Sequence, residues 1–161
     1  MVSVTPQRAA TAMLLCLILV VSACNLGSQV SPSAPAAKTT SNLVRHELEP
    51  LTKRFPALGP PVAASWVSGD WGDPRMPGPS LYWTDAIVEV SSATVDALKA
   101  SYRPVPTANK PDVWETLRGN LPQGGYLAGD QLDQAFRSTR INAQVFLAEG
   151  APVIVITATG E

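Results

Sequence analysis

The chain has 161 residues, of which 45% are hydrophobic, and its 12 basic and 13 acidic residues give a net charge of −1. A nucleic-acid-binding domain would need a basic face, so this charge balance argues against a nucleic-acid partner. The chain has one histidine and two cysteines, and this supply is too small for the usual zinc sites built from Cys and His ligands.

The N-terminal segment has the pattern of a signal peptide. Arg8 precedes an apolar run from Ala9 to Val21, and the small residues Ser22 and Ala23 follow it. As a helix, residues 9–23 would span about 22 Å, which is less than the ~30 Å hydrocarbon core of a bilayer. A positive start, a short apolar core and a small-residue end predict a cleaved leader rather than a membrane span.

The end of this segment, VSAC at residues 21–24, resembles the lipobox of bacterial lipoproteins. The resemblance implies that the thiol of Cys24 receives a diacylglyceryl group and that a lipoprotein signal peptidase cuts before it. The alternative is an ordinary secretory peptide cut after Ala23, which would leave a lone thiol in an oxidising compartment. Either cut discards Cys16 with residues 1–23, so no disulfide is expected within the mature monomer.

Lipidation at Cys24 predicts the location of the protein. Two acyl chains give stable anchoring, so we expect the chain to sit on the outer face of the cell membrane, or in the outer membrane of a bacterium that has two. Residues 24–41 form the lipidated cysteine and a flexible linker rich in Ser, Pro and Ala. Residues 42–161 form one globular domain. Its composition is similar to that of small uncharacterised lipoproteins of high-GC Gram-positive bacteria, a resemblance that implies no activity.

An apolar stripe at Val44, Leu48, Leu51, Phe55 and Leu58 opens the domain. Spacings of three and four predict one face of a helix. Because proline removes a helical hydrogen bond, this helix is expected to be kinked or restarted at position 50. The residues at 41 and 42, Ser and Asn, are candidates for its N-cap.

The remaining elements are predicted from β-forming runs, cap residues and turn signals. Strands are expected at 61–68 and 81–90, helices at 91–102, 110–120 and 129–139, and a hairpin at 141–150 and 151–160 that turns at 149–152. Paired strands separated by helices predict an α+β fold. We expect an antiparallel sheet of about four strands, formed by two hairpins, with helices packed on one face.

Searches for catalytic patterns exclude several classes. The only histidine, His46, lies in HELEP, where Pro50 occupies the position of the second histidine that a zinc-protease helix requires. Asp85 and Glu89 share the face of a strand that their charges mark as the wetter one. Their separation of roughly 13 Å is too wide for the ~5–9.5 Å of a glycosidase carboxylate pair. No catalytic residue, metal or cofactor is therefore predicted.

Aromatic side chains concentrate on the first strand pair and its loop. Trp66 and Trp83 are expected to fill the core, whereas Trp71 lies in a Gly/Pro-rich loop beside Asp70, Asp73 and Arg75. A large aromatic residue with charged neighbours is typical of binding sites carried by loops.

The sequence thus predicts a membrane-anchored, non-catalytic binding domain whose partner is an envelope protein or glycan. Two alternatives remain, a small envelope hydrolase that uses a carboxylate pair and a lipoprotein that binds a small solute.

Overall fold

A computed structural model describes Lys38 and residues 43–72 and 81–161 of the chain. The chain divides into two compact units, Met1–Ala34 and Pro35–Glu161, and the described residues all belong to the second. The predicted signal peptide, Cys24, Asp73 and Arg75 lie outside the described residues. In the described part of the chain, no helix has both the length and the apolar character needed to cross a membrane.

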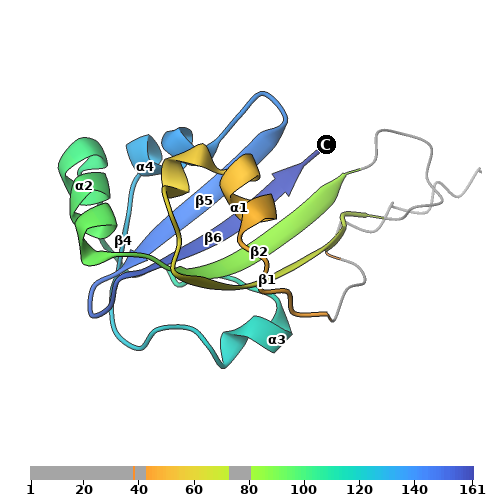
Figure 1. Ribbon diagram of the computed structural model, residues 1–161, viewed down its shortest axis with the longest axis horizontal. Helices are drawn as coiled ribbons and strands as arrows, with labels where there is room; N and C mark the ends of the chain where they lie inside the picture. Colours follow the sequence, from red (N-terminus) through yellow and green to blue (C-terminus); the bar gives the residue numbers. More distant parts are fainter. Residues whose placement is uncertain (1–37, 39–42, 73–80) are drawn as a thin grey trace, which may run out of the picture. The chain divides into compact units, whose positions relative to one another are not determined.

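The described domain is built on one antiparallel sheet with the strand order β1-β2-β6-β5-β4-β3 (Figure 1). The strands are β1 (Ala63–Asp70), β2 (Tyr82–Glu89), β3 (Val105–Thr107), β4 (Tyr126–Ala128), β5 (Ile141–Ala148) and β6 (Val153–Gly160). The α+β class is confirmed, as are the two predicted antiparallel pairs, β1 with β2 and β5 with β6. The expected count of four strands is wrong. The two additional strands have only three residues each, too few to show the alternation by which strands are recognised.

Helices cover both faces of the sheet, which corrects the expectation of helices on one face. The helices α1 (Glu49–Arg54), α2 (Ser92–Tyr102) and α4 (Asp130–Phe136), with the 3-10 turn η1 (Pro56–Leu58), lie on one side in Figure 1. Their buried residues pack with Val88, Ile154 and Ile156 of the sheet. The short helix α3 (Glu115–Arg118) lies on the other side, where its Leu117 packs with Val155.

The apolar stripe predicted as one helix, kinked or restarted at position 50, is divided between an extended segment and two short helices. Arg45 pairs through its backbone with Trp66 of β1, at N–O distances of 2.8 and 2.9 Å. Helix α1 begins only at Glu49, which places Pro50 in its first turn. That position suits proline because a first-turn N–H has no helical acceptor. Leu48 is the N-cap residue, and the predicted caps at 41 and 42 lie outside the described residues.

The structure confirms one predicted helix over almost its whole range and another only in part. Helix α2 covers almost the whole predicted range, and the Ser91 hydroxyl accepts from Thr94 N at 3.1 Å, as an N-cap should. The helix predicted at 110–120 starts only at Glu115. In this segment Trp114 N–H donates to the Asp85 carboxylate instead of to a helical carbonyl. A tertiary contact has replaced the first turn.

Helix α4 completes the edge of the sheet beside β5. Strand β4 pairs only with the end of β5, at Ala148 and Leu147. Earlier along β5, Asp133 Oδ1 accepts from Val145 N at 2.8 Å and Arg137 Nε donates to Ala143 O at 3.2 Å. Side chains at the end of α4 therefore bond backbone groups that a strand would otherwise pair, and they fix Arg137 at the open end of the sheet.

Candidate ligand-binding groove

The face of the sheet that α3 covers changes from apolar to polar along its length. Strands β2, β6 and β5 pair in register here, so that residues opposite one another point to the same side. The innermost set is apolar and the next two carry carboxylate, hydroxyl and amide groups. The three sets are Ile87, Val155 and Phe146; Asp85, Thr157 and Gln144; and Trp83, Thr159 and Asn142.

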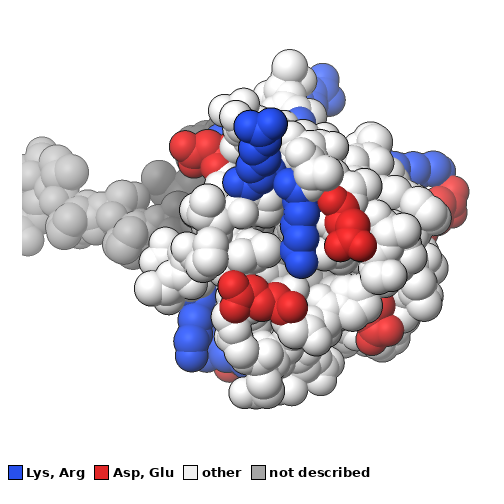
Figure 2. All heavy atoms as spheres, turned by 90° about the vertical axis from the view of Figure 1, so that its left-hand side faces the viewer, with Lys and Arg blue, Asp and Glu red and all other residues white. Residues whose placement is uncertain are grey.

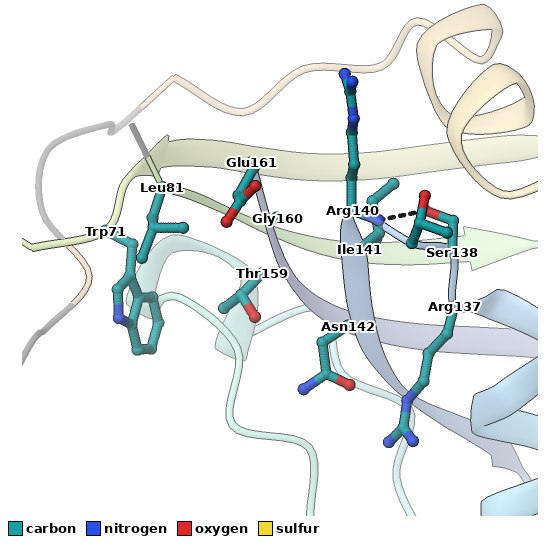
Figure 3. Close-up of a pocket in the computed structure, with 11 residues that line it drawn as sticks. Trp71, Leu81, Arg137, Ser138, Arg140, Ile141, Asn142, Thr159, Gly160 and Glu161 are labelled. Atoms are coloured by element: carbon teal, nitrogen blue, oxygen red, sulfur yellow. Dashed lines mark hydrogen bonds between the residues drawn. The ribbon is translucent and has the colours of Figure 1, made fainter. Parts of the chain in front are cut away.

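Two adjoining cavities of about 430 and 280 Å³ lie over the polar sets. Trp71, Arg137, Asn142 and Thr159 line both of them, and we call the combined depression the Trp71 groove. In Figure 3 the Trp71 indole and the Arg137 guanidinium stand on either side of Thr159 and Asn142, while the Arg140 side chain points away. The groove thus offers an aromatic surface, a cation, an amide and a hydroxyl to one ligand.

Asp85 lies at the inner wall of the smaller cavity and has no exposed side-chain surface. The prediction that Asp85 marks a wetter face is therefore wrong, because Lys38 and the segment before α3 cover it. Lys38 Nζ lies 2.7 Å from Asp85 Oδ2, which also accepts from Trp114 N at 2.7 Å. Glu89 is exposed and pairs with Val153 further along the strand, so it forms no carboxylate pair with Asp85.

The charge on Asp85 is only partly compensated. Burial raises the pKa of Asp85 above its ordinary value, while the hydrogen bond and charge of Lys38 and the Trp114 N–H act in the opposite direction. Asp85 Oδ1 is buried without a hydrogen-bond partner among the described residues, and the same holds for Trp114 Nε1. A buried carboxylate oxygen that lacks a donor costs free energy.

Aromatic rings fix the surroundings of Lys38. The rings of Trp83 and Trp114 stack with centroids 4.8 Å apart and an interplanar angle of 28°. Lys38 Nζ lies 5.3 Å from the centroid of a Trp83 ring and donates to Asp112 O at 3.1 Å. An ammonium group is therefore held by a carboxylate, a carbonyl and an aromatic face, which together are a favourable environment for a cation.

The structure describes two of the four predicted binding residues, and one of these two lines the groove. Trp71 follows β1, is half-buried and lines both cavities. Asp70 is the exposed last residue of β1 and lines neither, while Asp73 and Arg75 lie outside the described residues. Trp66 and Trp83 are buried as expected. His46 precedes α1 instead of lying on it, and its ring nitrogen Nδ1 hydrogen-bonds Ala64 O at 2.8 Å.

Sequence reasoning missed Lys38, Arg137, Asn142 and Thr159 as groove residues. A signal for part of this set was present in the last hairpin, where polar residues alternate at the start of one strand and the end of the next. Antiparallel pairing brings those two ends together on one face. Nothing in the sequence pairs residue 38 with residue 85.

Among the described residues, no group of three His, Cys, Asp or Glu side chains could hold a metal ion. Basic and acidic side chains are interspersed on the face shown in Figure 2, which carries no extended patch of one sign. The chain matches no protein-family model, no curated protein and no solved structure among those with which it was compared.

Proposed function

We propose that the protein is a lipoprotein held at the outer face of the cell membrane through Cys24, and that its domain binds an envelope glycan in the Trp71 groove. The observation that carries the binding proposal is the convergence of an indole, a guanidinium, an amide and a hydroxyl on one depression. Sugar rings present apolar C–H faces that pack on aromatic side chains, and their hydroxyls exchange hydrogen bonds with amides and guanidinium groups. A concave site with a few convergent polar groups is also the usual form of a small-ligand site.

A glycan fits these residues better than a protein surface does, because a protein partner requires a larger and flatter apolar patch. The hydrolase alternative is less well supported. Asp85 Oδ2 is already bonded to Lys38 and Trp114, and Oδ1 is buried. The carboxylate is therefore not presented to a scissile bond.

The binding proposal is tested with the full chain in detergent micelles, titrated with envelope oligosaccharides and followed by calorimetry. Trp71→Ala and Asn142→Ala should each weaken binding by about tenfold or more, the value of one lost aromatic or hydrogen-bonding contact. Asn120→Ala, a matched change at an exposed position after α3, should bind like the wild type. Equal affinity of all four proteins, or no binding by any, would rule out a glycan site in the groove.

Anchoring is tested separately by cell fractionation. Cys24→Ser should move the protein from the membrane to the soluble fraction or block its maturation, because serine offers no thiol for thioether formation. Cys16→Ser, in the segment that the leader would lose, should leave attachment unchanged. Membrane attachment of a Cys24→Ser protein that has lost its leader would point to another anchor, whereas a wild-type protein found in the soluble fraction would favour the ordinary secretory alternative.

A further inference from the structure

The inner end of the groove is shaped around an ammonium group. Lys38 Nζ contacts Asp85 Oδ2 at 2.7 Å, Asp112 O at 3.1 Å and the face of Trp83. The three groups come from β2 and from the segment before α3, 74 residues from Lys38 in the most distant case. We call them the Asp85 receptor. A carboxylate, a carbonyl and an indole select a cation over a neutral hydroxyl, because a neutral group would leave a buried carboxylate uncompensated.

Lys38 satisfies this receptor incompletely. It bonds one carboxylate oxygen, while Asp85 Oδ1 and Trp114 Nε1 are both buried and unpartnered within the described residues. A ligand that brings an ammonium group together with a second donor would satisfy the free acceptor of Asp85, which lines the smaller cavity. The receptor therefore holds more hydrogen-bonding capacity than its present occupant uses.

Lys38 can leave the receptor toward the groove. Its side chain is 20% exposed, whereas that of Asp85 is 0% exposed. Both residues line the 280 Å³ cavity together with Gln144 and Thr157. The ammonium therefore lies on the cavity side of the receptor, and its departure would enlarge that cavity.

We propose that the Asp85 receptor is the subsite for a primary ammonium group of the bound glycan, and that Lys38 occupies it as an internal competitor that the ligand displaces. This inference rests on the proposed glycan-binding function. The ammonium belongs either to an unacetylated amino sugar or to a peptide attached to the glycan, because the receptor recognises the charged amine that both share.

The test compares glucosamine oligosaccharides with N-acetylglucosamine oligosaccharides of the same length, at a pH at which the free amines are protonated. The wild type should bind the glucosamine oligosaccharides more tightly than the N-acetylated ones, by about tenfold or more, as expected for a hydrogen bond to a charged group. Lys38→Ala should strengthen amine binding further by removing the competitor. Asp85→Asn keeps an oxygen for Trp114 N–H and should abolish the preference. An N-acetylated oligosaccharide that carries a lysine-containing peptide distinguishes an amine on the peptide from one on the sugar.

A second measurement does not depend on any glycan. Lys38→Ala lacks three side-chain carbons and the ammonium, which n-propylammonium matches in number and charge, so this cation should raise the melting temperature of the variant. It should not do so for the Lys38→Ala/Asp85→Asn double variant, and 1-propanol should have no specific effect on either. No rise in the single variant would overturn the ammonium receptor even if the variant is too unstable for glycan titration.

The outcomes separate this inference from the proposed function. If both oligosaccharides bind equally and Trp71→Ala weakens both, the groove binds glycans and the ammonium subsite is refuted. If neither binds while n-propylammonium stabilises Lys38→Ala, the receptor exists but the proposed glycan function and the amine-bearing glycan ligand are refuted. A loss of amine binding in Lys38→Ala would show that Lys38 helps the ligand to bind, which contradicts competition.

Discussion

Replacing Lys38 by Met should destabilise the domain by leaving the Asp85 carboxylate buried with a single donor. Removing one partner of a buried ion pair costs about 3–5 kcal/mol. Lys38 is 20% exposed and Asp85 keeps its bond from Trp114 N, so we expect a loss shifted below that range by roughly 1 kcal/mol, to about 2–4 kcal/mol near pH 7. Methionine preserves an unbranched side chain of similar length beside Trp83, so that the change removes charge more than packing. At about 4 °C per kcal/mol for a domain of this size, the melting temperature should fall by roughly 8–16 °C.

The loss should depend on pH in a defined direction. Burial already raises the pKa of Asp85 above its ordinary value, and Lys38 opposes that shift. Without Lys38 the folded-state pKa rises further. A carboxyl that binds its proton more tightly when folded destabilises the native state as pH increases from about 4 through the folded-state pKa. The deficit of Lys38→Met should therefore be small near pH 4 and grow toward neutral pH.

Urea denaturation of the full chain, measured at several pH values, provides the assay. The Lys38→Met/Asp85→Asn double variant should recover most of the loss, since no buried charge remains. Lys53→Met is the matched control, because the Lys53–Glu49 pair is exposed and should contribute less than about 1 kcal/mol. A Lys38→Met deficit below about 0.5 kcal/mol, with no dependence on pH, would show that the contact between Lys38 and Asp85 does not form in solution.

Three further predictions concern the frame around the groove. Gly160→Ala should lower the unfolding free energy by about 1–3 kcal/mol, because a Cβ there would lie 2.7 Å from the Tyr82 hydroxyl. Gly119→Ala is its control, because a Cβ at that position meets nothing within 4 Å. Equal urea midpoints for the two variants would contradict the packing argument. Ser91→Ala should lower the unfolding free energy by about 1 kcal/mol through loss of the α2 cap, whereas Ser91→Gly should lower it by only a few tenths of that unit. Equal melting temperatures of Ser91→Ala and the wild type would show that the cap is dispensable. Burial raises the pKa of Asp133, so Asp133→Asn should gain stability relative to the wild type as pH rises above about 4. Urea denaturation at several pH values measures the difference in unfolding free energy between the two proteins. A difference that stays constant with pH would refute the raised pKa.

Part of the fold can be predicted from local sequence patterns. The β5–β6 hairpin can be predicted because two β-rich runs surround a short turn, and α2 because its Ser cap and apolar positions agree. Short or interrupted elements are harder to predict. Strands β3 and β4 have three residues each and are stabilised by pairing with distant segments rather than by their own composition.

The candidate site likewise has features that the sequence predicts and features that it does not. The prominence of Trp71 can be inferred from its loop, and the polar alternation near Asn142 and Thr159 is visible in the printed sequence. The burial of Asp85 cannot be inferred, because an acidic residue on a strand normally indicates a solvated face. Only contacts with residues far along the chain reverse that expectation.

By itself, the sequence therefore determined the α+β class and the antiparallel pairing of the longer strands, since these depend on β-rich runs and on the segments that join them, while the N-terminal export pattern stays a prediction. The tertiary structure alone decided that α3 covers the second face, that its first turn is given up to bond Asp85, and that Lys38 reaches that carboxylate. The physical reason is that pairing a buried charge is a long-range requirement. Residue types that are ordinary in isolation become a site only when the fold removes water from between them.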